Sequence, residues 1–274
     1  MIIKKLFSYF KGRQIWRIQI SEMDSLIIEE RDIINKKVFF SCIDKITGKT
    51  NWADKKFLDE DFWIGIEAIY RDTLFLHLFE KPDMPKHKQI IAVDLNTAKV
   101  KWINKDLTFD SISNNKVLAY IQKFEGRDFF LIDYSTGDVI ESLGSDSSSA
   151  EMFRQSVGDE LGNNFLFPSF LTDEGKYTKL NQSVLKVIGD TKYFGKIEFI
   201  EYENLFLFNY YEKNHEASLT NWLCIFDLQS QTVLLKEILN SSSPAPVPDS
   251  FFIHGDLVYF VKDKKELVAY LLQK

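Results

Sequence analysis

Residues 39–52, FFSCIDKITGKTNW, and the similar residues 90–102, IIAVDLNTAKVKW, decide the fold. In each segment an apolar run typical of a β-strand ends at an aspartate, Asp44 or Asp94, and a tryptophan follows eight residues later. An aspartate ends an apolar run twice more, at Asp133 and Asp227, and Thr or Ser follows all four by three residues. We interpret the pattern as the end of one strand, a tight turn and the start of the next strand.

The position after that Thr or Ser indicates the turn conformation. Gly48 and Gly137 occupy it in two copies, as expected where a four-residue hairpin turn requires a positive φ. Ala98 and Gln231 occupy it in the other two copies and depart from this expectation.

A second marker, Asp or Asn at the start of an apolar run, occurs six times at intervals of 41 to 52 residues. Asp and Asn suit such turns because their short side chains bond the nearby backbone. The chain therefore reads as six copies of a four-stranded unit of about 46 residues. The fourth copy is degenerate, with residues 177–182 (YTKLNQ) as its best third strand, and no segment has a convincing helical spacing of apolar residues. The six markers are Asp24, Asp72, Asn115, Asn163, Asn204 and Asp256.

The two ends of the chain complement each other. Residues 250–274 supply three strands of the last copy, whereas residues 2–9 precede the first copy without a partner. Pairing these ends would leave no open sheet edge. We therefore predict an all-β fold, a single six-bladed β-propeller domain over residues 1–274 with four-stranded antiparallel blades, its ring closed by the N-terminal strand in the last blade. Five or seven blades are the alternatives, and a solenoid is less favoured.

The run Asp-x-x-Thr-Gly-x-x-x-Trp, complete from Asp44 to Trp52 and nearly complete from Asp94 to Trp102, resembles the repeat of quinoprotein-type (PQQ-like) β-propellers. That superfamily includes pyrroloquinoline-quinone dehydrogenases, outer-membrane assembly scaffolds and many uncharacterised bacterial members. In it the tryptophan docks one blade against the next, so the resemblance implies architecture. It does not imply quinoprotein activity, because the chain lacks the adjacent cysteine pair that covers the cofactor, and we expect no cofactor.

Charge and the N-terminal residues bear on partners and location. The 40 acidic and 34 basic residues are spread without long blocks, which argues against a nucleic-acid partner. Residues 1–10 carry an apolar run too short for a signal peptide or a membrane span, so we expect a cytoplasmic monomer without membrane contact. Cys42 and Cys224 lie in separate apolar runs and are expected to be reduced, buried thiols.

One set of side chains could form a ligand site. The first strand of a propeller blade lines the channel, and acidic residues stand near the start of four predicted first strands. Converging carboxylates could bind a cation or a basic partner, and an aromatic ring at the same mouth could stack on a ligand. The alternative interpretations are turn chemistry for the carboxylates and blade packing for the ring. The candidates are Asp61, Asp110, Glu151 and Asp249, together with Trp63.

No catalytic set is recognisable. The chain has no Gly-rich phosphate loop and no Gly-x-Ser-x-Gly elbow, and residues 81–88 and 145–149 are interpreted as loops. The histidines lack the close spacing of a metal site and equivalent places in the repeat: His77, His87, His215 and His254. The sequence favours a non-enzymatic binding or scaffold module with a protein partner. The alternative is a channel-mouth hydrolase or lyase that uses the acidic residues and a divalent cation.

Overall fold

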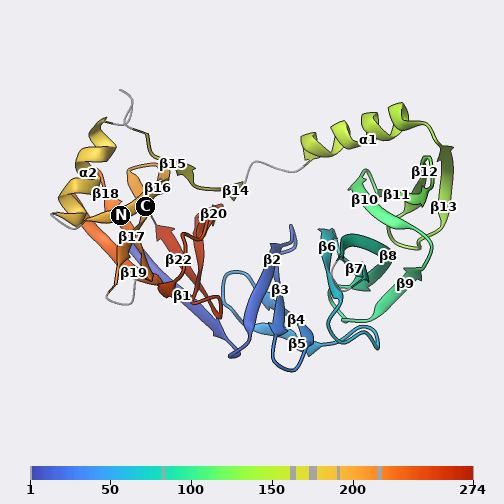
Figure 1. Cartoon of the computed structure of the whole chain (residues 1–274), viewed down its shortest axis with the longest axis horizontal. Coiled ribbons are helices and arrows are strands. Elements are labelled where there is room, and N and C mark those ends of the chain that lie inside the picture. Colours follow the sequence, from blue (N-terminus) through green and yellow to red (C-terminus); the bar gives the residue numbers. More distant parts are fainter. Residues whose placement is uncertain are drawn as a thin grey trace. The chain divides into compact units, whose positions relative to one another are not determined.

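A computed structural model describes residues 2–81, 84–160, 165–172, 178–189, 192–214 and 218–273. The chain divides into two compact units (Figure 1). The central unit comprises Arg13–Gly162, and the terminal unit comprises Met1–Gly12 together with Asn163–Lys274.

The central unit contains three four-stranded antiparallel sheets, in each of which neighbouring strands are also consecutive in the chain. The first sheet consists of β2 (Gln14–Ile20), β3 (Ser25–Asp32), β4 (Lys37–Asp44) and β5 (Thr50–Lys55). The second consists of β6 (Ile64–Tyr70), β7 (Thr73–Lys81), β8 (Met84–Asp94) and β9 (Val100–Asn104). The third consists of β10 (Thr108–Ser113), β11 (Lys116–Lys123), β12 (Gly126–Asp133) and β13 (Val139–Gly144).

The repeated aspartates and tryptophans explain how these sheets turn and dock. Asp44 Oδ1 accepts hydrogen bonds from the backbone N–H of Thr47, at 2.7 Å, and from its hydroxyl, at 2.8 Å. Each tryptophan then donates its indole N–H to a backbone carbonyl in the turn after the third strand of the next sheet, Trp52 to Leu95 at 2.7 Å and Trp102 to Tyr134 at 3.1 Å. Both acceptors directly follow the turn aspartate of their own repeat, so the docking contact itself repeats. The expected role of the tryptophans as contacts between neighbouring sheets is confirmed.

The turn conformation is the same whether or not a glycine is present. The φ angles are 69° at Gly48, 79° at Gly137, 53° at Ala98 and 58° at Gln231. The aspartate carboxylate binds the turn N–H groups in all four repeats, and these bonds hold the positive φ even where a Cβ opposes it. Ala98 and Gln231 depart from the pattern in sequence but not in structure.

The terminal unit contains two five-stranded antiparallel sheets. In the first, β1 (Ile2–Phe10) pairs with β22 (Glu266–Gln273), followed by β21 (Leu257–Lys262), β20 (Phe251–His254) and β14 (Phe165–Leu166). The expected pairing of the N-terminal strand with the C-terminal strand is therefore confirmed. The second sheet runs in the order β15 (Ser169–Phe170), β16 (Tyr193–Tyr202), β17 (Leu205–Lys213), β18 (Leu219–Asp227) and β19 (Thr232–Ser243).

The fourth repeat differs from the prediction. Its described residues form α1 (Ser147–Glu160), the two short strands β14 and β15, and α2 (Thr178–Ile188). The third strand predicted at 177–182 is wrong from Thr178 onward, where α2 begins, while Tyr177 and the marker Asn163 lie outside the described residues.

Two local signals explain the helices. Asp146 caps α1, because its Oδ1 accepts the backbone N–H groups of Ser148 and Ser149 at 3.0 and 3.2 Å, so the predicted loop at 145–149 is wrong from Ser147 onward. In α2, three apolar residues at intervals of four are buried against the core of the β16–β18 sheet. They are Leu180, Val184 and Ile188, and their spacing is the helical signal that the sequence interpretation missed.

The fold is all-β with five antiparallel sheets of four or five strands in the described ranges. The six-blade count is not confirmed, because the described part of the fourth repeat does not form a sheet of its own. Cys42 and Cys224 are free and fully buried, as expected. Neither α1 nor α2 has the length and apolar character that a bilayer span needs.

Candidate functional site

Two of the predicted acidic residues meet, but around a cation of the chain itself. Arg154 on α1 binds Asp110 on β10 with two hydrogen bonds of 2.9 Å, from Nε to Oδ2 and from Nη2 to Oδ1. Its Nη1 donates to Glu151 Oε2 at 3.1 Å. Glu151 belongs to helix α1 and does not precede a first strand as predicted. The bidentate bond to Asp110 anchors α1 to the third sheet, and one guanidinium is shared by the two carboxylates.

The other predicted residues do not join this pair. Asp61 forms an ion pair with Lys56 in the loop before β6, and this partner lowers the pKa of Asp61. Trp63 packs edge to face on Phe79 of β7, with ring centroids 6.2 Å apart, which is a contact within its own repeat. Asp249 lies in the terminal unit before β20, where its backbone N–H donates to Glu198 Oε1 at 3.2 Å.

A different cluster forms in the second sheet of the central unit, where β6, β7 and β8 contribute Glu67, His77 and His87. Glu67 is the extra residue of a β-bulge, since Ile66 and Ala68 pair with consecutive residues of β7. The sequence interpretation missed the cluster because it assigned residues 81–88 to a loop, whereas β8 begins at Met84. Two histidines ten residues apart across a tight β7–β8 hairpin were the available signal.

The three side chains are in close contact. Glu67 Oε2 lies 2.8 Å from the Nδ1 atoms of both His77 and His87. The imidazole rings are stacked, with centroids 3.4 Å apart and planes 8° from parallel. Only the contact with His87 is aligned as a hydrogen bond, so neither ring nitrogen of the buried His77 has a hydrogen-bond partner.

Burial and charge set the ionisation of the cluster. Burial lowers the pKa of His77, although the neighbouring Glu67 opposes this, so the imidazole is neutral near pH 7. Burial alone would raise the pKa of Glu67, but the proximity and charge of the two imidazoles lower it to about 2. The cluster therefore combines an ionised carboxylate with a neutral imidazole, both in the protonation state that binds a metal ion.

A buried ion pair borders the cluster. Arg31 donates from Nε and Nη2 to Glu29 Oε1 at 2.9 and 2.7 Å, and Glu29 Oε2 accepts the backbone N–H of Ile66 at 3.0 Å. Gly65 lies next to both this pair and His77. A Cβ at this position would be 3.4 Å from Glu29 Oε2 and 3.2 Å from His77 Nε2. The glycine gives both side chains room against the backbone of β6.

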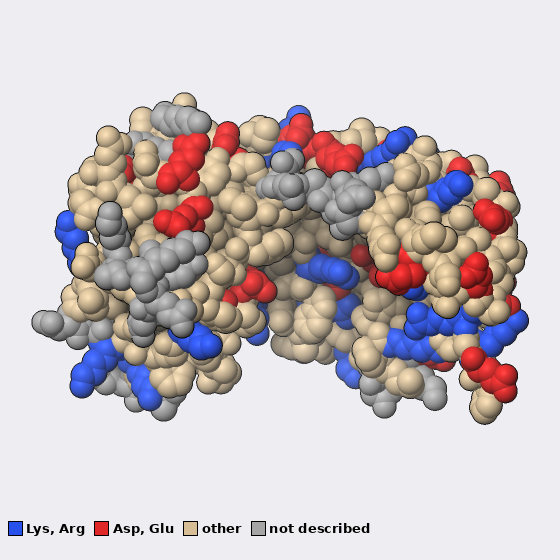
Figure 2. Space-filling view, turned by 90° about the horizontal axis from the view of Figure 1, so that it is seen from above, with Lys and Arg blue, Asp and Glu red and all other residues tan. Residues whose placement is uncertain are grey.

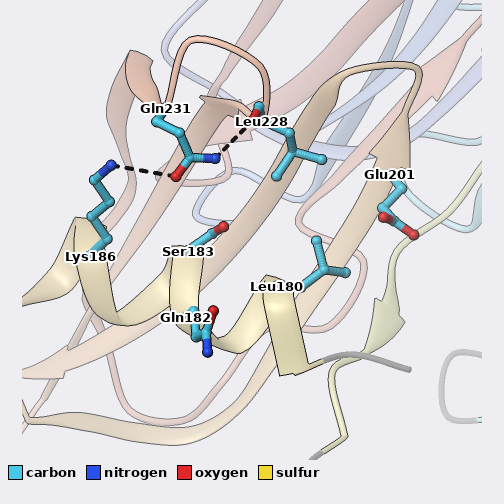
Figure 3. A pocket seen from close by; sticks show the side chains of 7 residues that line it. All are labelled: Leu180, Gln182, Ser183, Lys186, Glu201, Leu228 and Gln231. Atoms are coloured by element: carbon cyan, nitrogen blue, oxygen red, sulfur yellow. Dashed lines mark hydrogen bonds between the residues drawn. The ribbon is translucent and has the colours of Figure 1, made fainter. Parts of the chain in front are cut away.

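The described residues of the terminal unit line a pocket of about 600 Å³ (Figure 3) and a smaller one. Side chains of α2 face the β18–β19 turn there, and Lys186 donates to Gln231 Oε1 at 3.4 Å. Glu201 stands apart from this bond, so the pocket offers no convergent set of like charges. The smaller pocket, about 220 Å³, is mostly apolar and is lined by Phe170, Tyr211 and residues 246–248.

Two exposed phenylalanines precede Phe170, a lining residue of the smaller pocket, in the sequence. Phe165 and Phe167 are 38% and 61% exposed, and both contact Phe252, with ring centroids 6.2 and 5.8 Å away. We call these three residues the aromatic patch. Contiguous exposed aromatic side chains are uncommon on monomeric proteins and typically mark contact surfaces.

Surface charge is mixed. On the face shown in Figure 2, acidic and basic side chains are both present, and several basic side chains gather in one group at the lower right.

Residues 20–102, which include the Glu67–His77–His87 cluster, match a family described as "Domain of unknown function (DUF4905)". No curated protein matches the chain in sequence.

Similar solved structures include a quinohemoprotein alcohol dehydrogenase, ADHIIG, from Pseudomonas putida HK5, with 11% identity and a TM-score of 0.27 over 90% of this chain. The chain spans half the length of that enzyme. The AfRom2 CNH domain is 10% identical, with 99% of each chain covered and a TM-score of 0.36. The Dos1 propeller is 8% identical, with 95% of this chain and 68% of that chain covered and a TM-score of 0.32. TM-scores of this size do not establish a common fold.

Proposed function

We propose that the chain is a non-enzymatic binding or scaffold module built on a β-propeller domain, and that it binds a protein partner through the aromatic patch. The observation that carries the proposal is the exposure of Phe165 and Phe167 on and beside β14, an edge strand of only two residues. Keeping two such rings in water costs free energy that a partner recovers by covering them. The repeated tryptophan contacts support a relationship with quinoprotein-type propellers at the level of architecture.

The state of the acidic residues supports a non-enzymatic role. The enzyme alternative needs carboxylates that converge on a substrate or a cation. Asp110 and Glu151 instead bind Arg154, and Asp61 binds Lys56. A carboxylate in an ion pair with its own chain is a poor general base, because the neighbouring cation stabilises its ionised form.

Photo-crosslinking tests the proposal. The photoreactive residue p-benzoylphenylalanine replaces Phe167 in the full chain, and the same residue at Phe124 is the control, because Phe124 is fully exposed at the β11–β12 turn of the central unit. In cells that produce the chain, we expect a discrete adduct with one protein at position 167 and none at position 124. The purified partner should bind Phe167→Ser at least about 10-fold more weakly than the unsubstituted chain.

Other outcomes contradict the proposal. Equal adducts at both positions, or no adduct at 167, would remove the assigned surface. An adduct between two copies of the chain would show that the patch joins identical chains, in conflict with the monomer that we expect by light scattering. Turnover of a small molecule that is lost in Asp110→Asn, with α1 still folded, would favour an enzyme.

A further inference from the structure

We propose that Glu67, His77 and His87 form a binding site for one divalent transition-metal ion of the Zn²⁺ class. The three ligand atoms come from adjacent strands β6, β7 and β8 and all lie within 4.8 Å of one another. Two imidazole nitrogens with one carboxylate oxygen are a donor set that suits Zn²⁺ and disfavours Mg²⁺ and Ca²⁺, which prefer oxygen ligands. The site does not depend on the aromatic patch, which lies in the other unit.

The unsatisfied state of His77 is the first argument for an ion. The residue is 2% exposed, and neither of its ring nitrogens has a hydrogen-bond partner. A buried polar group without a partner costs free energy, so native proteins nearly always satisfy such groups. A metal ion on Nδ1 would satisfy the nitrogen that faces Glu67.

The position of Glu67 is the second argument. Its Oε2 lies 2.8 Å from the Nδ1 atoms of both imidazoles, and its side chain is 15% exposed. The nearby Arg31 is already engaged by Glu29. A divalent ion at this point would contact one carboxylate oxygen and two ring nitrogens.

His87 gives an ion access to the cluster, and its ring can turn to bind the ion. Its side chain is 32% exposed, whereas that of His77 is almost fully buried, so an ion can reach the cluster from the side of His87. Parallel rings do not direct their nitrogen lone pairs at one point, and ligand bonds to Zn²⁺ are about 2.0–2.2 Å long. Binding therefore requires one ring to turn, and the more exposed ring is the one that can. Three protein ligands leave a fourth position of the tetrahedron for water.

The surroundings hold the other ligands in place. Phe79 packs edge to face on His77, with ring centroids 4.9 Å apart. Gly65 leaves no side chain between β6 and the His77 ring. Ligands fixed by packing lose little entropy on binding an ion, which favours affinity.

Zinc titration of the full chain tests the site. The purified protein is freed of metal with EDTA, dialysed and titrated with ZnCl₂ in a calorimeter, and freshly purified protein is analysed by elemental mass spectrometry. We expect one Zn²⁺ per chain, no binding of Mg²⁺ or Ca²⁺ under the same conditions, and visible absorption bands when Co²⁺ is added instead. Affinity should fall as the pH decreases, because protons compete for the imidazoles.

Variants locate the ion. Glu67→Gln and His87→Ala should each weaken Zn²⁺ binding by more than the roughly 10- to 100-fold that loss of an outer-shell partner costs. His87 is partly exposed, so this variant is expected to fold, and circular dichroism checks each protein. His254→Ala and His215→Ala are the controls and should bind as the unsubstituted chain does. Failure of the unsubstituted chain to bind Zn²⁺, or unchanged binding by both Glu67→Gln and His87→Ala, overturns the proposal. Loss of Zn²⁺ binding in His254→Ala or His215→Ala also overturns the proposal.

Discussion

Replacing Arg31 with methionine should cost the central unit about 3–5 kcal/mol of unfolding free energy. Glu29 and Arg31 are 1% and 4% exposed in their side chains, so water solvates neither charge. Methionine keeps much of the apolar stem but removes both hydrogen bonds to Glu29 and those to the carbonyls of Phe62 and Ile64, at 3.0 and 3.1 Å. Glu29 would retain the N–H of Ile66 and would otherwise be a buried charge without a counterion.

The double variant Glu29→Gln with Arg31→Met separates this cost from a general loss of packing. Glutamine is neutral and can still accept the N–H of Ile66, so no charge remains buried. A buried ion pair replaced as a whole is often close to neutral for stability. We therefore expect the double variant to lie within about 1 kcal/mol of the unsubstituted protein, and so to be at least about 2 kcal/mol more stable than Arg31→Met alone.

Urea unfolding followed by tryptophan fluorescence measures these values. Four of the five tryptophans belong to the central unit, so the signal reports mainly on that unit: Trp16, Trp52, Trp63 and Trp102. An Arg31→Met variant within about 0.5 kcal/mol of the unsubstituted protein, the range of ordinary surface substitutions, would show that Glu29 does not need this counterion. A double variant as unstable as Arg31→Met alone would show that the cost is lost packing and not a buried charge.

Further predictions concern the turns and the thiols. Gly137→Ala should destabilise the central unit by about 2–4 kcal/mol, because φ is 79° and a Cβ would lie 2.7 Å from the Trp102 ring; an unchanged urea midpoint would contradict this. Ala98→Gly, where φ is 53°, should stabilise it by about 0.5–1 kcal/mol in the same assay, and a loss of stability would show that the Ala98 side chain matters more than its backbone strain. Burial raises the pKa of Cys42 and raises that of Cys224 to about 12, so a thiol reagent should find no reactive cysteine in the native protein at pH 8 and two after unfolding. The backbone N–H of Thr47 lowers the pKa of Asp44 below its ordinary value of 3.8, so the stabilising ionised form is complete above that value and is lost as the pH falls below it. Asp44→Asn should accordingly make the urea midpoint less sensitive to acid, and an unchanged pH profile would count against the turn contacts.

The acidic candidates show why side-chain proximity is hard to read from sequence. Their positions relative to the repeat suggested convergence, but Asp110 and Glu151 bind Arg154, Asp61 binds Lys56, and Asp249 lies in the other unit. Arg154 reaches Asp110 because α1 packs on the third sheet, and α1 replaces a strand that the repeat had predicted. Because a helix stands where a strand was predicted, the surroundings of both Asp110 and Glu151 differ from those expected.

The sequence by itself determined the strand ends, the turns, the docking tryptophans and the pairing of the two chain ends. These features depend on short-range chemistry, such as a carboxylate that binds the N–H groups two and three residues later, or on a pattern that recurs along the chain. Only tertiary structure brings Glu67, His77 and His87 together. The helices of the fourth repeat do have local signals, the cap at Asp146 and the apolar spacing of α2, but the strand pattern of the other repeats concealed them. Side chains alternate between the faces of a strand, and a bulge of one residue reverses that alternation. Because Glu67 lies in such a bulge, and Gln89 with a φ of 61° marks an irregular pairing opposite His77, the face on which each ligand lies depends on how three strands pair.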